Sequence, residues 1–181
     1  MKTMNKKVLF SLLSGIFVLF TLSSCLIGGS EIHSTPEIIY ASPITRHSTD
    51  SIPADTLLIK VTEDGYVLDT LQVGDTALFD LVFSTGYNNM QRITISHDTA
   101  CSQIHYYHRN QLDSIFLPSS DYERGEFLLD QGVMAVRMQV GYIATQPKEN
   151  PKLKIQLESD SQYSPGKRTI TTPIIPKKDY K

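Results

Sequence analysis

Apolar and polar residues alternate along several stretches of the chain, a pattern typical of strands that bury one face. Residues 77–83 carry Ala, Phe, Leu and Phe at every second position, and residues 133–142 extend the same alternation over a longer stretch. The segments 57–62, 92–96 and 153–158 alternate over fewer residues. No segment after residue 25 has a sustained helical period. The pattern therefore predicts an all-β protein.

Polar and glycine-containing segments separate the expected strands. Glu63-Asp64-Gly65 has the composition of a hairpin turn, because Gly adopts positive φ at no steric cost. Residues 86–89 and 146–151 predict further loops, and shorter strand candidates lie at 104–108 and 114–117. Seven or eight strands at this spacing predict an antiparallel β-sandwich.

The apolar faces of the strongest strand patterns predict the core. These faces place the following side chains inside: Phe79, Leu81, Val136, Val140 and Ile155. An aspartate at Val136 would bury an unpaired charge, which costs more than a cavity.

The N-terminus has the features of a secretory signal. Residues 1–7 carry three lysines and no acidic residue, and residues 8–22 form an uncharged apolar run. This run is shorter than the roughly 20 apolar residues that a spanning helix needs, but it suits the h-region of a signal peptide. It ends in Leu22-Ser23-Ser24-Cys25, which resembles the bacterial lipobox. An ordinary secretory signal with a chance cysteine is the alternative.

The lipobox resemblance implies cleavage before Cys25 and acylation of this residue. Two or more acyl chains hold a protein stably on a membrane, since each buried CH₂ contributes about 0.8 kcal/mol. No Asp follows Cys25 directly, which favours the outer membrane, and both its periplasmic and its surface face stay open. Signal removal takes away three lysines, so the mature chain is more acidic than the formal net charge of −2.

The segment Asp130-Gln131-Gly132-Val133-Met134-Ala135-Val136 resembles the approach to the penultimate strand of immunoglobulin-like domains. Met134 and Val136 replace the Tyr and Cys of that pattern, so neither the tyrosine corner nor the disulfide transfers. The chain is similar in pattern to small Ig-like lipoproteins of Bacteroidota. This resemblance implies an immunoglobulin-like sandwich and does not fix a function.

Four regions follow from these patterns. We expect a signal peptide over residues 1–24, a lipid-anchored tether over 25–53, an Ig-like sandwich over 54–160 and a flexible tail over 161–181. The tether assignment rests on its Pro, Gly, Ser and Thr content. The tail assignment rests on its prolines and charged end.

Composition excludes several classes of protein. With 40% hydrophobic residues the chain is too apolar for a disordered tail, and its two cysteines exclude a disulfide-stapled miniprotein. The 17 basic residues are scattered and outnumbered by 19 acidic ones, which argues against nucleic-acid binding. Once Cys25 is acylated, Cys101 is the only thiol left, so no intramolecular disulfide forms.

Residues with metal-binding or catalytic chemistry are sparse. His105 and His108 point to opposite faces of an extended strand, and a zinc site needs three or four convergent ligands. A thiol site of Cys101 with His97 and His105 is the less favoured alternative, because no catalytic signature surrounds it. We therefore expect no catalytic residue, no metal and no cofactor.

Tyrosines are the remaining candidates for contact with a ligand or partner. The chain has nine tyrosines and no tryptophan, and four of the tyrosines fall in or near predicted loops and edges: Tyr87, Tyr106, Tyr107 and Tyr122. Exposed rings can stack on a sugar or anchor a protein, although tyrosine is also common in strands. The sequence thus favours a non-enzymatic envelope lipoprotein that binds or organises a protein partner. A glycan- or small-ligand-binding accessory lipoprotein is the alternative.

Overall fold

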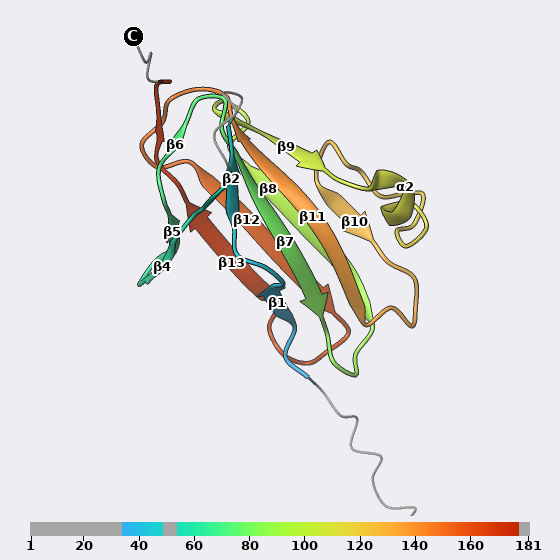
Figure 1. The fold of residues 1–181 in the computed structure, drawn as a ribbon. Helices are drawn as coiled ribbons and strands as arrows, with labels where there is room; N and C mark the ends of the chain where they lie inside the picture. Colours follow the sequence, from blue (N-terminus) through green and yellow to red (C-terminus); the bar gives the residue numbers. More distant parts are fainter. Residues whose placement is uncertain (1–33, 49–53, 178–181) are drawn as a thin grey trace, which may run out of the picture. The chain divides into compact units, whose positions relative to one another are not determined.

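The computed structural model describes residues 34–48 and 54–177 (Figure 1). Two six-stranded sheets, called A and B here, pack face to face, and a two-stranded sheet lies beside them. The prediction of an all-β sandwich is confirmed. The expected signal peptide and Cys25 lie outside the described residues.

Sheet A contains the two longest strands of the described chain. Its strand order is β3-β2-β7-β11-β9, and β1 also pairs with β7. β1 and β2 follow each other along the same edge of β7. The bounds are β1 (Glu37–Tyr40), β2 (Thr45–His47), β3 (Asp55–Thr56), β7 (Thr76–Ser84), β9 (Ser102–Tyr106) and β11 (Ala135–Ala144).

Sheet B has the order β10-β8-β12-β13-β5-β4. Its bounds are β4 (Ile59–Thr62), β5 (Gly65–Leu68), β8 (Met90–His97), β10 (Glu126–Leu128), β12 (Lys152–Ser159) and β13 (Gly166–Thr171). The third sheet pairs β6 (Leu71–Gln72) with β14 (Ile174–Ile175), and the short helix is α2 (Arg109–Leu112). β13 pairs with β5, and β14 with β6, in parallel, so the pairing is not wholly antiparallel as the sequence predicted.

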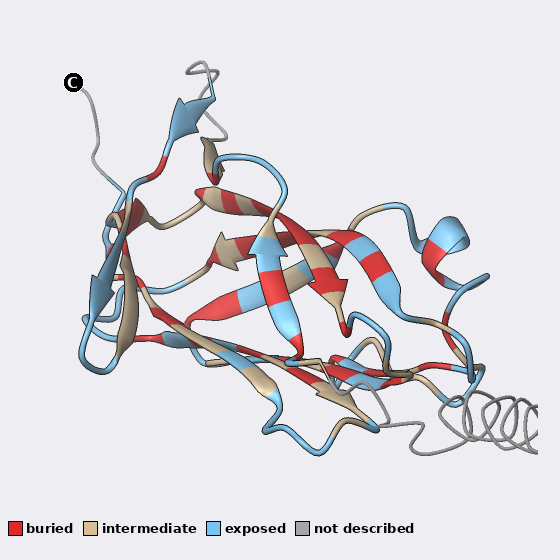
Figure 2. Cartoon of the chain, turned by 90° about the horizontal axis from the view of Figure 1, so that it is seen from below, coloured by how far each residue is buried: buried red, intermediate tan, exposed pale blue. Residues whose placement is uncertain are grey.

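The core lies between sheets A and B. All five side chains predicted to be buried are buried, which confirms the faces assigned to β7, β11 and β12: Phe79, Leu81, Val136, Val140 and Ile155. Figure 2 shows the buried positions as bands that alternate with exposed ones along the strands. The period of two in the sequence is therefore the period of burial.

The sandwich extends beyond the boundaries expected from the sequence. β1 and β2 lie within the segment predicted as tether, and β13 and β14 lie within the segment predicted as a flexible tail. These two assignments were wrong for the described residues, because Ile38, Ile44, Ile170 and Ile174 are buried in the core. Each of these short strands has a single buried apolar residue, within it or directly before it, so no alternation of buried and exposed positions can be recognised.

Two local expectations also differ from the structure. Residues 114–117 form no strand; they follow α2 as a turn, and Phe116 makes only an isolated bridge to Leu129. β4 was expected to be half-buried, yet Val61 is 79% exposed because β4 is the outer edge of sheet B and, of the strands that the structure describes, pairs only with β5.

Candidate functional site

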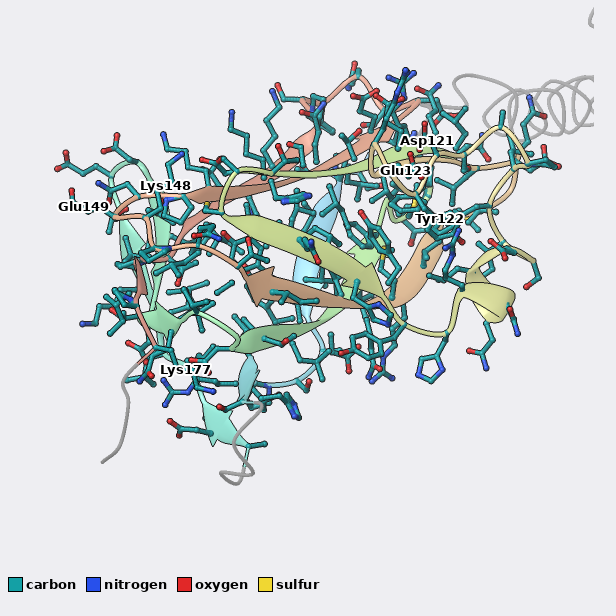
Figure 3. The ribbon with its side chains drawn as sticks, turned by 90° about the horizontal axis from the view of Figure 1, so that it is seen from above. Asp121, Tyr122, Glu123, Lys148, Glu149 and Lys177 are labelled. Carbon is teal, nitrogen blue, oxygen red and sulfur yellow. The ribbon has the colours of Figure 1, made fainter. Side chains whose placement is uncertain are left out.

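A cleft opens where the chain passes from one sheet to the other. β8 belongs to sheet B and β9 to sheet A, and a turn over residues 98–101 joins them. The two strands diverge beyond this turn, because each pairs within its own sheet. The cleft between them measures about 680 Å³ and is lined by residues of β8, β9, α2 and the turn before β10. Figure 3 shows Tyr122 of this turn on the side toward α2, with Glu123 farther from the helix.

One wall of the cleft is the free edge of β9. Among the strands of residues 34–48 and 54–177, β9 pairs with β11 alone. At its end Tyr107 N donates to Gln139 O at 3.1 Å. Hydrogen-bonded and non-bonded residue pairs alternate along antiparallel strands, so the N–H groups of Ile104 and Tyr106 point away from β11. A short row of main-chain donors and acceptors therefore faces the cleft side.

An aromatic cluster forms the wall near α2. The Tyr106 and Tyr122 rings meet edge to face at 5.6 Å, and each also packs edge to face on Phe127. Tyr122 Oη donates to Asp113 Oδ1 at 2.6 Å, and the Arg109 guanidinium lies 4.1 Å from the centre of the Tyr122 ring. Burial, followed by this hydrogen bond, raises the pKa of Tyr122 to about 12. The cluster is therefore neutral and fixed, and Arg109 supplies an exposed positive charge beside it.

The opposite end of the cleft is formed by His97 and the turn that follows it. His97 Nδ1 lies 3.0 Å from Ser102 Oγ, and Ser102 Oγ donates to Asp98 O at 2.8 Å. Burial lowers the pKa of His97, and the negative charge of Asp98 opposes this effect. The imidazole is therefore neutral at pH 7 and forms a hydrogen bond with the Ser102 hydroxyl.

The thiol site considered from the sequence is not assembled. Cys101 is buried, and its Sγ lies 3.5 Å from Asp98 O. Burial raises the pKa of the Cys101 thiol, which keeps it protonated and weakly nucleophilic. Within residues 34–48 and 54–177, no group of three or more His, Cys, Asp or Glu side chains could hold a metal ion.

The four tyrosines singled out in the sequence do not form one patch. Tyr106 and Tyr122 lie together at the cleft, but Tyr106 is buried. Tyr107 lies against Gly141 of β11, where its Cε2 would be 3.1 Å from an added Cβ, and meets His105 at 4.5 Å between ring centres. Tyr87 is 75% exposed in the loop after β7, away from the cleft. Tyr106 and Tyr107, which are adjacent in sequence, thus face opposite sides of sheet A.

Sequence reasoning missed Arg109 and the free edge at Ile104. Arg109 follows directly on the pair Tyr107-His108, where no strand pattern continues. The free edge of β9 arises because β8 and β9 belong to different sheets, and the alternation of residues along each strand does not predict which sheet the strand joins.

Comparisons with known proteins are uninformative about function. No family model matches the chain, and no curated protein matches it. Among solved structures, secreted serine protease VesC from Vibrio cholerae is 10% identical with a TM-score of 0.37, over 65% of this chain and 23% of that one. A family 123 glycoside hydrolase from Clostridium perfringens is 11% identical with a TM-score of 0.45, over 80% of this chain and 28% of that one. The chain thus spans less than a third of either protein, and likenesses this distant indicate no activity.

Membrane-spanning helices are absent from the part of the chain that the structure describes. None of its helices is long and apolar enough to cross a bilayer. Cys25, the predicted lipid attachment site, lies before this part.

Proposed function

We propose that the protein is a lipid-anchored envelope lipoprotein whose sandwich binds an extended segment of a protein partner along β9. The observation that carries this proposal is the free edge of β9 beside a cleft of about 680 Å³. An added strand would pair its main chain with Ile104 and Tyr106. Its alternate side chains would enter the cleft, where Arg109 and the aromatic cluster offer a charge and an apolar wall.

A protein segment fits this site better than a glycan does. Sugar stacking needs an open aromatic face. Arg109 covers the Tyr122 ring, and Tyr106 is buried. The most exposed of the four tyrosines, Tyr87, lies outside the cleft. Main-chain pairing of a peptide strand with β9 needs none of these tyrosine rings.

The anchor is proposed from Leu22-Ser23-Ser24-Cys25. We expect Cys25→Ala to remain unacylated and to leave the membrane fraction, because the acyl chains supply most of the membrane affinity. Fractionation after a salt wash, together with metabolic lipid labelling, measures this. Retention of the variant in the pellet with its lipid label intact would refute the anchor.

Site-specific photo-crosslinking in intact cells tests the partner site. A photoreactive residue at Gln103, which is exposed on β9, should give a discrete protein adduct, whereas Lys154 on the outer face of β12 should not. Ile104→Pro should abolish the adduct, because it removes the free N–H without breaking the β9–β11 ladder. Ile104→Ala is the matched control, since it loses the side chain but keeps the N–H.

Two results would overturn the partner site. One is an equal yield of adducts at Gln103 and Lys154. The other is an adduct that survives Ile104→Pro in a protein whose melting temperature matches that of Ile104→Ala.

A further inference from the structure

Three loops meet at the end of the sandwich where the described chain begins. They are the loops over residues 85–89, 130–134 and 160–165 (Figure 1). Ser34 joins two of them: Tyr87 N donates to Ser34 Oγ at 3.1 Å, and Ser161 Oγ donates to Ser34 O at 2.9 Å. The third is joined by Thr85 N, which donates to Met134 O at 3.0 Å. We call these three loops the tether end.

The tether end presents large side chains to solvent. Tyr87, Met134 and Tyr163 are 75%, 45% and 48% exposed, one from each loop. The three loops contain no basic residue and two acidic residues. The Asp160 carboxylate accepts hydrogen bonds from Asn89, and Asp130 is exposed, with its Oδ1 accepting from Gln131 N at 2.8 Å. Exposed tyrosines suit the boundary between lipid headgroups and acyl chains, where amphipathic rings are enriched. The tether end does not suit attraction to anionic lipid, which needs basic clusters.

The position of Cys25 in the chain brings a bilayer within reach of this end. Ser34 lies nine positions after Cys25, so the intervening chain spans about 30 Å at most. We propose that the tether end rests on the lipid surface through Tyr87, Met134 and Tyr163, which fixes the orientation of the sandwich. This inference rests on the lipid anchor of the proposed function.

Because the lipid anchor already holds the protein on the membrane, a contact of three side chains is enough to orient the sandwich. The short link to the acylated Cys25 gives the tether end a high effective concentration at the lipid surface. Interactions too weak to hold a free protein on a membrane can therefore orient the anchored one. The loop over residues 145–151 lies at the opposite end of β11 and points away from the bilayer in this orientation. Part of the cleft, at His97 and Thr99, lies toward that distal end.

Quenching by lipid tests the orientation in the acylated protein. Cysteines introduced one at a time at Gln131 and Ser164, both exposed in the tether end, carry a fluorescent label, and Glu149→Cys labels the distal loop. The native Cys101 is buried in all of them. The protein is reconstituted in phosphatidylcholine vesicles that contain lipid spin-labelled near the headgroup. We expect quenching several-fold stronger at the two tether-end positions than at Glu149.

A serine variant isolates the three side chains. Tyr87→Ser/Met134→Ser/Tyr163→Ser should lose the difference in quenching while still floating with the vesicles. Leu58→Ser/Val61→Ser is the matched control, because both residues are exposed and apolar but lie on or beside β4. This control should keep the difference, and melting temperatures verify that both variants are folded.

The outcomes separate the inference from the anchor. An acylated protein that floats but shows equal quenching at the three labels refutes the oriented contact and leaves the anchor standing. Undiminished quenching in the triple serine variant also refutes it. Absence of acylation at Cys25, measured by mass spectrometry, refutes the anchor and the inference with it.

Discussion

The two open sides of the sandwich, where the edges of sheets A and B face each other, are closed in different ways. On one side β1 lies near β13. Arg168 Nη2 donates to Ile38 O at 3.3 Å, and the Arg168 guanidinium lies 5.4 Å from the centre of the Tyr66 ring. Tyr40 packs on Phe79 with 6.5 Å between ring centres. We call this the sealed side.

On the other side, β9 and β10 remain apart. The aromatic cluster closes only the deep part, and Arg109, His97 and the free edge of β9 border a cleft. Unpaired edges expose a protein to unwanted pairing, and most sheets cover them. A side chain that closes a gap serves stability, whereas one that borders an open cleft is free to serve binding. Substitutions on the two sides should therefore separate these properties.

Glycine replacement gives the largest expected effect, and here the backbone geometry of each glycine, not the closure of the gap, sets the loss of stability. Gly125 on the cleft side has φ +66°, and a Cβ there would lie 2.0 Å from Ile95 O. Gly125→Ala should lower the free energy of unfolding by about 3 kcal/mol or more, because strain and overlap add. Gly166→Ala on the sealed side, where a Cβ would lie 2.7 Å from Pro36 O, should cost about 1–2 kcal/mol, because the main chain has to shift but no positive φ adds strain. Urea denaturation compares them, and equal losses would contradict this ranking.

Arg168→Met should weaken the sealed side. It removes the hydrogen bond to Ile38 O and the contact with Tyr66, and should lower the free energy of unfolding by about 1–2 kcal/mol. The yield of partner adduct at Gln103 should not change. A loss of adduct in a folded Arg168→Met variant would contradict the claim that the sealed side affects stability without affecting binding.

Arg109→Met should have the opposite profile. Arg109 is exposed, so losing its contact with Tyr122 should lower the free energy of unfolding by less than about 1 kcal/mol. The adduct at Gln103 should decrease, because the cleft loses its exposed cation. An unchanged adduct yield would remove Arg109 from the site.

Low pH should lower the free energy of unfolding through protonation of His97 on the cleft side. Burial lowers the pKa of His97 below 6.5, so the stability that its neutral form contributes is present above pH 6.5 and is lost as the pH falls below that value. The loss should be under about 0.5 kcal/mol, because solvent screens a half-exposed ring. Urea titrations at several pH values compare the parent with His97→Asn. A difference in stability that does not shrink toward low pH would contradict this origin.

Strand alternation reports burial well where strands are long. Residues 77–83 and 135–142 each place an apolar side chain inside at every second position, and the structure buries them as expected. Ile38 and Ile44 could not be recognised in this way, because β1 and β2 are short and Pro43 separates them. Their burial depends on pairing with β7, which is distant in sequence.

The candidate site was less predictable than the core. Tyr106 and Tyr122 are 16 positions apart and meet only because the chain folds back over α2 and the following turns. The free N–H of Ile104 depends on which strands lie beside β9, a property of the sheet and not of the local sequence. Long-range pairing of this kind leaves no periodic signal.

Amide hydrogen exchange across β9 tests the central claim most directly. In the free protein, the amide of Ile104 should exchange fast, and those of Gln103 and His105 should exchange slowly, since their N–H groups face β11. Binding of the crosslinked partner, or of a peptide from its contact segment, should protect Ile104 and leave Gln103 and His105 unchanged. An Ile104 amide that is already protected in the free protein, or that stays unprotected in the complex, would contradict strand addition at this edge.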